Sequence, residues 1–219
     1  KAQSLIRHLQ RGWSFLDGRF GEFIEILPAQ QQLHDEKWYQ GTADAVYQNL
    51  DILRRHDPEH VLILAGDHVY KMDYGRMLEG HVRARAKMTI ACIDVPLHEA
   101  SSLGVMAVNT EGRVVGFEEK PSSPVPAPGR PDYALASMGI YVFDAAFLYD
   151  ELVRDADDAN SSHDFGKDII PKLVKQGQAV AHPFELSCVG ARVGEAPYWR
   201  DVGTIDAYWD ANIDLTATD

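Results

Sequence analysis

The chain has 219 residues, of which 45% are apolar, and a formal net charge of -12. This length and apolar share suffice for one large domain with a buried core, and they exclude a disordered chain. The acidic balance repels polyphosphates and anionic lipids, so we expect neither a nucleic-acid partner nor a membrane partner. No apolar stretch approaches the roughly 20 residues that span a bilayer, and the only cysteines are Cys92 and Cys188. We expect a cytoplasmic protein with two reduced thiols.

The N-terminal region begins inside an amphipathic pattern. Apolar residues recur at helical spacing from Ala2 to Leu9, and the pattern ends at Gly12, which predicts a helix. Because the first residue is not Met and the pattern starts at once, we expect the sequence to be a piece of a longer protein. An alternating stretch over 22–27 then predicts a strand, and the polar segment 28–41 a loop.

The next part of the chain alternates between strand and helix patterns. Thr42 is expected to cap a helix over 42–53. A short, continuously apolar strand over 61–65, of the kind that a parallel sheet buries on both faces, precedes a helix over 74–82 and a strand over 88–95. Strand, helix and strand with short connections form a βαβ unit. The pattern therefore predicts an α/β fold with a mainly parallel sheet.

The second half of the chain starts with a different rhythm, because two alternating stretches flank a Glu-Gly turn signal. The expected elements are a β-hairpin over 104–121, a Pro-rich loop over 122–131, a strand over 135–144, a helix over 145–153, a solvated acidic loop over 155–160, a helix over 165–174, a strand over 178–184 and a last helix capped by Thr204.

Asp67 follows the first buried strand, at a position where α/β sheets bind ligands. The loops beyond the C-terminal strand ends are where polar groups converge in such sheets. Gly66 lets the backbone turn and a ligand approach, and a carboxylate here is suited to holding Mg²⁺ against a phosphate. An aspartate that only caps the following turn is an equal alternative on this segment alone. His68 is more simply a hydrogen-bonding spacer than a catalyst.

Three further segments carry chemistry-bearing residues. The segment F-E-E-K-P, 117–121, contains two carboxylates and an ammonium, for which a salt-bridged strand end is the favoured interpretation. The segment Y-W-R-D-V-G-T, 198–204, adds a second aspartate, and a metal bridging two phosphates is commonly held by carboxylates from distant parts of a chain. The segment W-Y-Q-G-T-A-D-A, 38–45, offers aromatic rings and a glycine turn at a helix start, suited to a base, a sugar or an anion, although a plain capped helix is the alternative.

Several catalytic motifs are absent from the sequence: G-x-G-x-x-G after a strand, G-x-x-x-x-G-K-[ST], H-E-x-x-H, C-x-x-C and G-x-S-x-G. Their absence weakens the dehydrogenase, P-loop NTPase, zinc hydrolase and serine hydrolase interpretations.

Taken together, seven segments resemble one known family. They are W-Y-Q-G-T-A-D-A-V, L-A-G-D-H-V-Y-K-M-D-Y, G-V-M-A-V, E-E-K-P, L-A-S-M-G-I-Y-V-F, S-S-H-D-F-G-K-D-I-I-P and Y-W-R-D-V-G-T-I-D-A-Y-W-D-A-N. In this order, and over essentially the whole chain, they are similar to the bacterial glucose-1-phosphate adenylyltransferases, or ADP-glucose pyrophosphorylases. Sugar-nucleotide pyrophosphorylases in general share the Gly-Asp pair and Glu-Lys-Pro. The forms S-H-D-F-G-K-D and Y-W-R-D-V-G-T point to the ADP-glucose enzymes.

The resemblance implies transfer of the adenylyl group of ATP to α-D-glucose 1-phosphate, which gives ADP-glucose and pyrophosphate in the first committed step of bacterial glycogen synthesis. It implies that Asp67 and Asp201 hold a catalytic Mg²⁺ and that Lys120 binds the phosphate. Glu119, Ser137 and the backbone of Gly104 would contact the glucose. Tyr39, Gly41 and Thr42 would line a substrate and nucleotide pocket, and Arg55 would be a regulatory position for a nucleotide inhibitor.

The resemblance also implies a fold and an assembly. Residues 1–219 would form a Rossmann-like nucleotidyltransferase domain without its N-terminal strand and Gly-rich loop and without the C-terminal left-handed β-helix domain of the family. Such a piece would be inactive alone, and the full-length protein would be a homotetramer that responds to small-molecule allosteric effectors.

Two alternatives remain open. One is a sister pyrophosphorylase with another nucleotide or sugar. The other is a catalytically silent regulatory subunit, against which the joint presence of Asp67, Lys120 and Asp201 argues.

Overall fold

The structure, a computed structural model, describes residues 2–27, 38–191 and 196–216. The chain divides into two compact units, 1–39 and 40–219. The expectation of one catalytic domain over the whole chain stays a prediction.

The first unit contains helix α1 (Ala2–Gly12) and the short 3-10 turn η1 (Gly18–Phe20). The helix confirms the amphipathic pattern. The expected strand over 22–27 is wrong: a strand needs a partner ladder, and these residues form none with the described part of the chain. Most of the expected loop, residues 28–37, lies outside the described residues.

The second unit contains the sheets and the helices that cover them. Its helical segments are α2 (Thr42–Tyr47), α3 (Leu50–Arg55), α4 (Tyr74–Ala84), η2 (Ala100–Ser102), α5 (Ala145–Ala156), η3 (Phe165–Ile169), α6 (Ile170–Lys175), η4 (Phe184–Leu186) and α7 (Ile205–Asp214). Its strands are β1 (His60–Leu64), β2 (His68–Tyr70), β3 (Met88–Pro96), β4 (Gly104–Val108), β5 (Val114–Glu119), β6 (Tyr133–Asp144), β7 (Ala179–Pro183) and β8 (Trp199–Asp201).

Six strands form one sheet around the long strand β6. The order is β5-β4-β6-β3-β7, and β1 pairs with the C-terminal part of β6. Strands β2 and β8 form a separate antiparallel ribbon. The α/β class and the mixed sheet are confirmed.

The proportion of parallel pairing is smaller than expected. Strands β3 and β7 pair in parallel, whereas the other ladders among the described strands of this sheet are antiparallel. Strands β1 and β3, which α4 connects, do run in the same direction, as a βαβ unit requires. They are not neighbours, however, because β6 lies between them and runs the opposite way.

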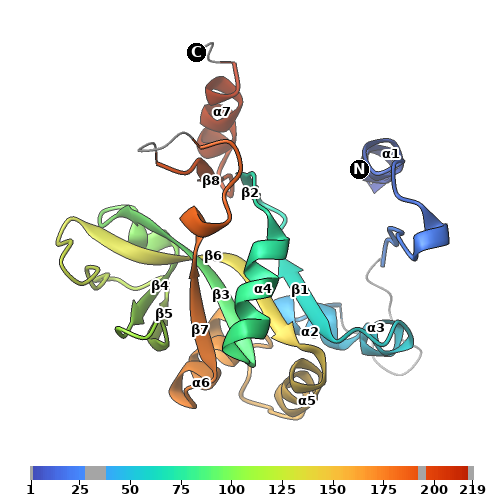
Figure 1. The fold of residues 1–219 in the computed structure, drawn as a ribbon, viewed down its shortest axis with the longest axis horizontal. Coiled ribbons are helices and arrows are strands. Elements are labelled where there is room, and N and C mark those ends of the chain that lie inside the picture. Colours follow the sequence, from blue (N-terminus) through green and yellow to red (C-terminus); the bar gives the residue numbers. More distant parts are fainter. Residues whose placement is uncertain (1, 28–37, 192–195, 217–219) are drawn as a thin grey trace. The chain divides into compact units, whose positions relative to one another are not determined.

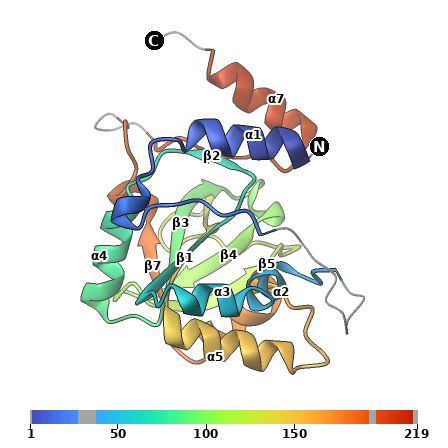
Figure 2. The ribbon, with the colours of Figure 1, turned by 90° about the vertical axis from the view of Figure 1, so that its right-hand side faces the viewer.

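Helices cover both faces of the sheet. The sequence of β6 is apolar because its side chains on both faces are covered. Successive strand side chains point to opposite faces. Tyr141 and Phe143 pack with residues of α5 and α6, whereas Ile140 and Val142 pack with Met77 of α4. Figure 1 shows α4 and α5 as separate layers of the second unit, and Figure 2 shows α2, α3 and α5 grouped on one side.

Two expectations in the region 42–65 need correction. The helix over 42–53 is split into α2 and α3, because the side-chain amide of Asn49 donates to the carbonyl of Ala45 at 2.8 Å, a bond that competes with the helix backbone. Strand β1 is only partly covered, with Leu64 44% exposed, since it pairs with β6 alone among the described strands.

The remaining expected elements are confirmed in α4, β3, the hairpin of β4 and β5, β6, α5, η3 with α6, β7 and α7. Thr204 caps α7 as predicted, because its Oγ1 accepts the backbone N–H of Ala207 at 3.1 Å. The acidic stretch over 155–160 is not wholly solvated, since Asp155 is buried. Within the part of the chain that the structure describes, no helix has the length and apolar character needed to cross a membrane.

Candidate active site

A cavity of about 610 Å³ lies in the second unit, where strand β1 ends. Its walls come from α2, from β1 and the residues that follow it, from β5 and β6, and from η3 and the residue before it. Polar, glycine and aromatic positions in these walls include Thr42, Asp67, Glu119, Gly139, Tyr141 and Asp164. The fold therefore brings Thr42, Asp67 and Glu119, which the sequence predicted as site residues, to one cavity.

The ribbon of β2 and β8 brings Asp67 and Asp201 together. His68 stands opposite Asp201 in the register of the ribbon. The backbone N–H of Val202 donates to the carbonyl of Asp67 at 2.8 Å, which ties the two segments beside the cavity. Ligand atoms of Asp67, His68 and Asp201 lie within 4.8 Å of one another.

This group fits a divalent cation such as Mg²⁺. Hard cations prefer carboxylate oxygens and keep several waters, and Asp67 is exposed enough to allow both. His68 Nε2 lies 3.5 Å from Asp67 Oδ1 and 3.9 Å from Asp201 Oδ1, at the limit of or beyond hydrogen-bonding distance. Its buried Nδ1 has no hydrogen-bond partner among the described residues. His68 thus lies between the carboxylates, a closer involvement than the spacer role expected for it.

A bulge in β6 shapes the wall next to Asp67. The register between β3 and β6 shifts where Ile90 pairs with Tyr141 but Cys92 pairs with Ser137. Gly139 lies inside this bulge with a φ of +67°, and its carbonyl accepts the backbone N–H of Ala65 at 3.0 Å. A Cβ on Gly139 would stand 3.0 Å from the Cβ of Ala65, so the glycine lets β6 approach the end of β1 closely.

Glu119 is the last residue of β5, and its carboxyl lies next to Gly104 and Gly166. A Cβ on Gly104 would lie 3.0 Å from Glu119 Oε2, and one on Gly166 would lie 2.7 Å from it. Burial raises the pKa of the Glu119 carboxyl, and the nearby Asp164 raises it further, while Lys120 lowers it. A half-buried carboxyl with this shift is suited to hydrogen-bonding a hydroxyl-rich ligand.

Thr42 bonds across the cavity wall instead of capping its own helix. Its Oγ1 donates to Asp164 Oδ2 at 3.1 Å and accepts the backbone N–H of Phe165 at 3.0 Å. The N-cap position belongs to Gly41. The N–H groups of Ala43 and of its successor in α2 donate to the carbonyl of His163, so the helix start does not offer them to an anion as expected.

The other predicted residues are not among the described residues that line the cavity. Lys120 directly follows Glu119, is exposed, and has a left-handed φ of +49°. Ser137 is buried on β6, where its Oγ accepts the backbone N–H of Gly139 at 3.3 Å. Tyr39 is the last residue of the first unit. Arg55 lies on α3, exposed, and pairs with Asp51 at 3.2 Å.

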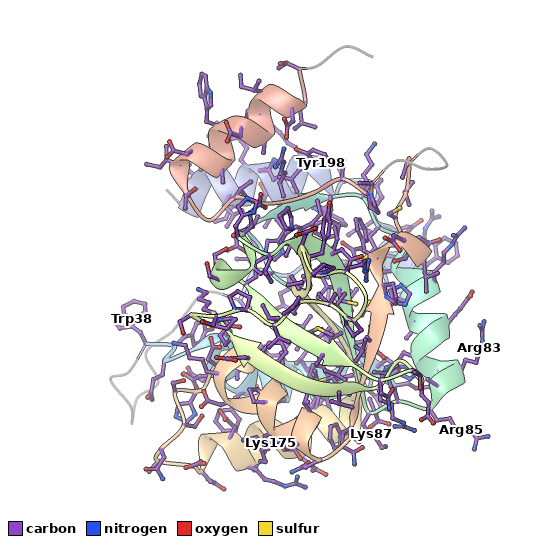
Figure 3. All side chains as sticks on the ribbon, turned by 90° about the vertical axis from the view of Figure 1, so that its left-hand side faces the viewer. Trp38, Arg83, Arg85, Lys87, Lys175 and Tyr198 are labelled. Atoms are coloured by element: carbon purple, nitrogen blue, oxygen red, sulfur yellow. The ribbon has the colours of Figure 1, made fainter. Side chains whose placement is uncertain are left out.

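The cavity wall is acidic. Its described lining includes Asp67, Glu119 and Asp164 but no lysine or arginine. Figure 3 shows that Arg83 and Arg85 project outward from the C-terminal end of α4. A phosphorylated ligand in the cavity therefore needs a cation from elsewhere, such as a metal at the paired aspartates or the Lys120 ammonium.

Comparison with protein families decides the class of this site. The sequence profile of a family described as nucleotidyl transferase matches residues 1–218. The chain belongs to the nucleotidyl transferase family.

Relatives of this nucleotidyl transferase chain are named glucose-1-phosphate adenylyltransferase. One from Nitrosospira multiformis is 66% identical over 215 residues, one from Nitrosomonas europaea 65% over 217, and one from Methylobacillus flagellatus 66% over 216. These matches cover 98 to 99% of this chain and 50% of each relative. The chain thus spans about half the length of the curated relatives it matches.

Sequence reasoning missed part of the wall of this nucleotidyl transferase cavity. Tyr141 and Gly139 lie on a segment predicted only as a strand, and Asp164, Phe165 and Gly166 received no role. The segment S-S-H-D-F-G-K-D contained a usable signal, because serine, aspartate and glycine are common in turns, and loops commonly carry functional residues.

Proposed function

We propose that the protein transfers the adenylyl group of ATP to α-D-glucose 1-phosphate and releases ADP-glucose and pyrophosphate. The observation that carries this proposal is the 66% identity, over 98% of the chain, to a relative named glucose-1-phosphate adenylyltransferase. The cavity supports it, because carboxylates suited to a metal and a carboxyl suited to a sugar lie at the same end of the sheet.

The metal would be held by Asp67 and Asp201, with His68 beside them. Bound there, Mg²⁺ would supply neutralisation of the charge that two phosphorylated substrates bring together. The ribbon of β2 and β8 supports this assignment, because its ladder and the bond from Val202 to Asp67 hold the backbone next to both carboxylates.

The sugar phosphate would lie along the end of β5. Lys120 binds the phosphate with its ammonium, and Glu119 accepts from or donates to a glucose hydroxyl according to its protonation. Gly104 leaves room for the Glu119 side chain, and Ser137 lies beside the bulge of β6, which supports assigning both residues to the sugar. Thr42 lies in the wall that α2 contributes, and this assignment also gives Tyr39 and Gly41 contacts with the substrate or the nucleotide.

The chemistry is an in-line displacement at phosphorus. A phosphate oxygen of glucose 1-phosphate attacks the α-phosphorus of ATP, the new P–O bond forms, and the bond to the departing pyrophosphate breaks. No covalent bond to the protein is required. The chain contributes by holding two anions in line and by offsetting their repulsion.

Wider properties follow from the same proposal. The complete gene product would act in the cytoplasm in glycogen synthesis, assemble as a homotetramer, and bind small-molecule allosteric effectors. Arg55 would take part in binding a nucleotide inhibitor. Its partner Asp51 is exposed as well, and an exposed pair of this kind contributes little, so an anion can replace Asp51 at low cost.

The test uses the complete gene product with ATP, glucose 1-phosphate and Mg²⁺. We expect release of pyrophosphate and formation of a product with the mass of ADP-glucose. A panel of other nucleoside triphosphates and other sugar 1-phosphates is the control for specificity. A higher kcat/KM with another pair would replace the proposed substrates, and no pyrophosphate with any pair would overturn the proposal.

A further inference from the structure

A partly buried hydrogen-bonded cluster outside the cavity joins the end of α5 to the segment before η3. Asp155 is 9% exposed, although it opens an acidic stretch. Its Oδ1 accepts the hydroxyl of Ser161 at 2.7 Å, and its Oδ2 lies 3.0 Å from His163 Nδ1. Because a carboxylate only accepts hydrogen bonds, this Nδ1 carries the proton. The backbone N–H of His163 also donates to Ser161 Oγ at 2.9 Å.

The cluster holds His163 in an uncommon backbone conformation. The φ of His163 is +56°, in the left-handed region that residues other than glycine seldom adopt. Such a conformation persists only where surrounding interactions determine it. Here the interactions are the bonds among Asp155, Ser161 and His163.

The left-handed turn directs the His163 carbonyl to the start of α2. This carbonyl accepts the backbone N–H groups of Ala43 at 2.9 Å and Asp44 at 3.3 Å. It also lies so close to Gly41 that a Cβ there would stand 2.2 Å from it. The left-handed turn at His163 therefore requires a residue without a side chain at position 41.

The same turn sets the position of the cavity wall. Asp164, the next residue, accepts the Thr42 hydroxyl and the backbone N–H groups of Gly166 and Lys167. Gly166 in turn packs against Glu119. A chain of direct contacts thus leads from the buried carboxylate of Asp155 to the carboxyl that we assign to the sugar.

We propose that Asp155 and His163 are positioning residues, which fix the wall formed by Asp164 and Gly166 and so set the affinity for the sugar phosphate without touching it. This inference rests on the proposed function, because it takes glucose 1-phosphate as the ligand at Glu119. It predicts a larger effect on glucose 1-phosphate than on ATP, because the contacts lead through Asp164 and Gly166 to Glu119, while they reach the proposed nucleotide side only at Gly41 and Thr42.

The experiment measures KM for both substrates in variants of the complete gene product. Asp155→Ala should raise KM for glucose 1-phosphate about tenfold, equal to about 1.4 kcal/mol of binding, and raise KM for ATP by a clearly smaller factor. Asp155→Asn, which keeps an acceptor for Ser161, should give a smaller rise. Ser161→Ala removes the bonds of the Ser161 hydroxyl to Asp155 and to the backbone N–H of His163 but keeps the contact between Asp155 and His163, so it serves as the milder variant if Asp155→Ala does not fold.

A matched control lies one turn earlier on the same helix. Glu151 is 1% exposed and pairs with Arg154 and, at 3.2 Å, with Lys172, but the structure shows no bond from it to the segment 161–166. Glu151→Ala should lower the melting temperature at least as much as Asp155→Ala while leaving both KM values unchanged.

A glycine rescue separates positioning from general stability. Glycine adopts positive φ without steric cost. His163→Gly should therefore retain a nearly normal KM for glucose 1-phosphate, whereas His163→Ala should raise it. The double variant Asp155→Ala with His163→Gly should recover most of the loss caused by Asp155→Ala.

The outcomes distinguish this inference from the proposed function. A wild-type protein that releases no pyrophosphate overturns the proposed function and the ligand assumed here. With an active wild type, equal KM changes for both substrates, the same changes in Glu151→Ala, or no rescue by glycine would each show that Asp155 and His163 serve stability alone.

Discussion

Gly166 and Glu119 pack so closely that a Cβ on the glycine would stand 2.7 Å from the carboxyl oxygen Oε2. Real Cβ atoms essentially never approach a neighbour at this distance. The two residues come from η3 and from the end of β5, so this contact joins two walls of the cavity and fixes the direction of the Glu119 side chain.

Replacing Gly166 by alanine should therefore push Glu119 out of place. In Gly166→Ala we expect KM for glucose 1-phosphate to rise about tenfold or more, the equivalent of one lost hydrogen bond of about 1.4 kcal/mol, with KM for ATP nearly constant. Steady-state kinetics on the complete gene product measures both values. Gly18→Ala, where an added Cβ meets nothing within 4 Å, is the control. Unchanged kinetics in Gly166→Ala would remove Glu119 from the sugar site.

Replacing Asp67 by asparagine keeps the shape of the side chain and removes a charge from the proposed metal site. We expect kcat to fall by orders of magnitude with an unchanged fold, because a lost metal ligand affects the transition state most strongly. Asp73→Asn is the control, since Asp73 is an exposed aspartate that caps α4 through the N–H of Gly75 at 3.0 Å. A kcat for Asp67→Asn within about tenfold of wild type, about 1.4 kcal/mol of barrier, would contradict the metal role.

Replacing Lys120 by alanine should weaken binding of the sugar phosphate more than it slows turnover. The ammonium contacts phosphate oxygens in the ground state and in the transition state alike, so its loss appears as a higher KM for glucose 1-phosphate. A charge-assisted bond of about 2 to 3 kcal/mol corresponds to a rise of roughly 30- to 150-fold. Lys175→Ala, at the exposed end of α6, is the control (Figure 3). An equal rise in KM for ATP would show that Lys120 does not discriminate between the substrates.

Much of the fold could be predicted because its signals are local. The apolar runs in β3 and β6 and the helical periodicity of α4 depend on neighbours in sequence. Whether two strands pair in parallel or antiparallel does not depend on neighbours in sequence. That β6 lies between β1 and β3 depends on contacts between residues far apart in the chain, and the sequence of a doubly buried strand reads the same whether its neighbours are parallel or antiparallel.

The candidate site shows the same division. Asp67 could be predicted from its place after a strand, because that position has a physical meaning in any α/β sheet. The buried state of Asp155 could not, since a run of acidic residues is most simply solvated and its partners Ser161 and His163 depend on a return of the chain. The true bonds of Thr42 were likewise hidden, because a threonine before a helix is equally consistent with a local cap.

A buried histidine away from the cavity makes the stability of the fold depend on pH. His81 of α4 is 1% exposed, its Nδ1 lies 2.8 Å from Thr89 Oγ1, and the His60 ring packs edge-on against it. Burial, together with the neighbouring His60, lowers the pKa of His81 to about 4 from its usual 6.5. The unfolded chain therefore binds more protons than the folded chain between these two pH values. The contribution of His81 to stability is complete above about pH 6.5 and is lost as the pH falls toward 4.

The shift corresponds to at most about 3 kcal/mol of unfolding free energy between pH 7 and pH 4. Denaturant titrations at several pH values should show wild type losing stability on acidification more steeply than His81→Gln, whose amide can still bond to Thr89 but does not titrate. His98→Gln is the control, because His98 is 81% exposed and should leave the slope unchanged. If the unfolding free energies of wild type and His81→Gln changed with pH by the same amount, His81 would have the pKa of a free histidine in the folded state. This outcome would contradict the prediction, because burial against His60 disfavours the charged imidazole.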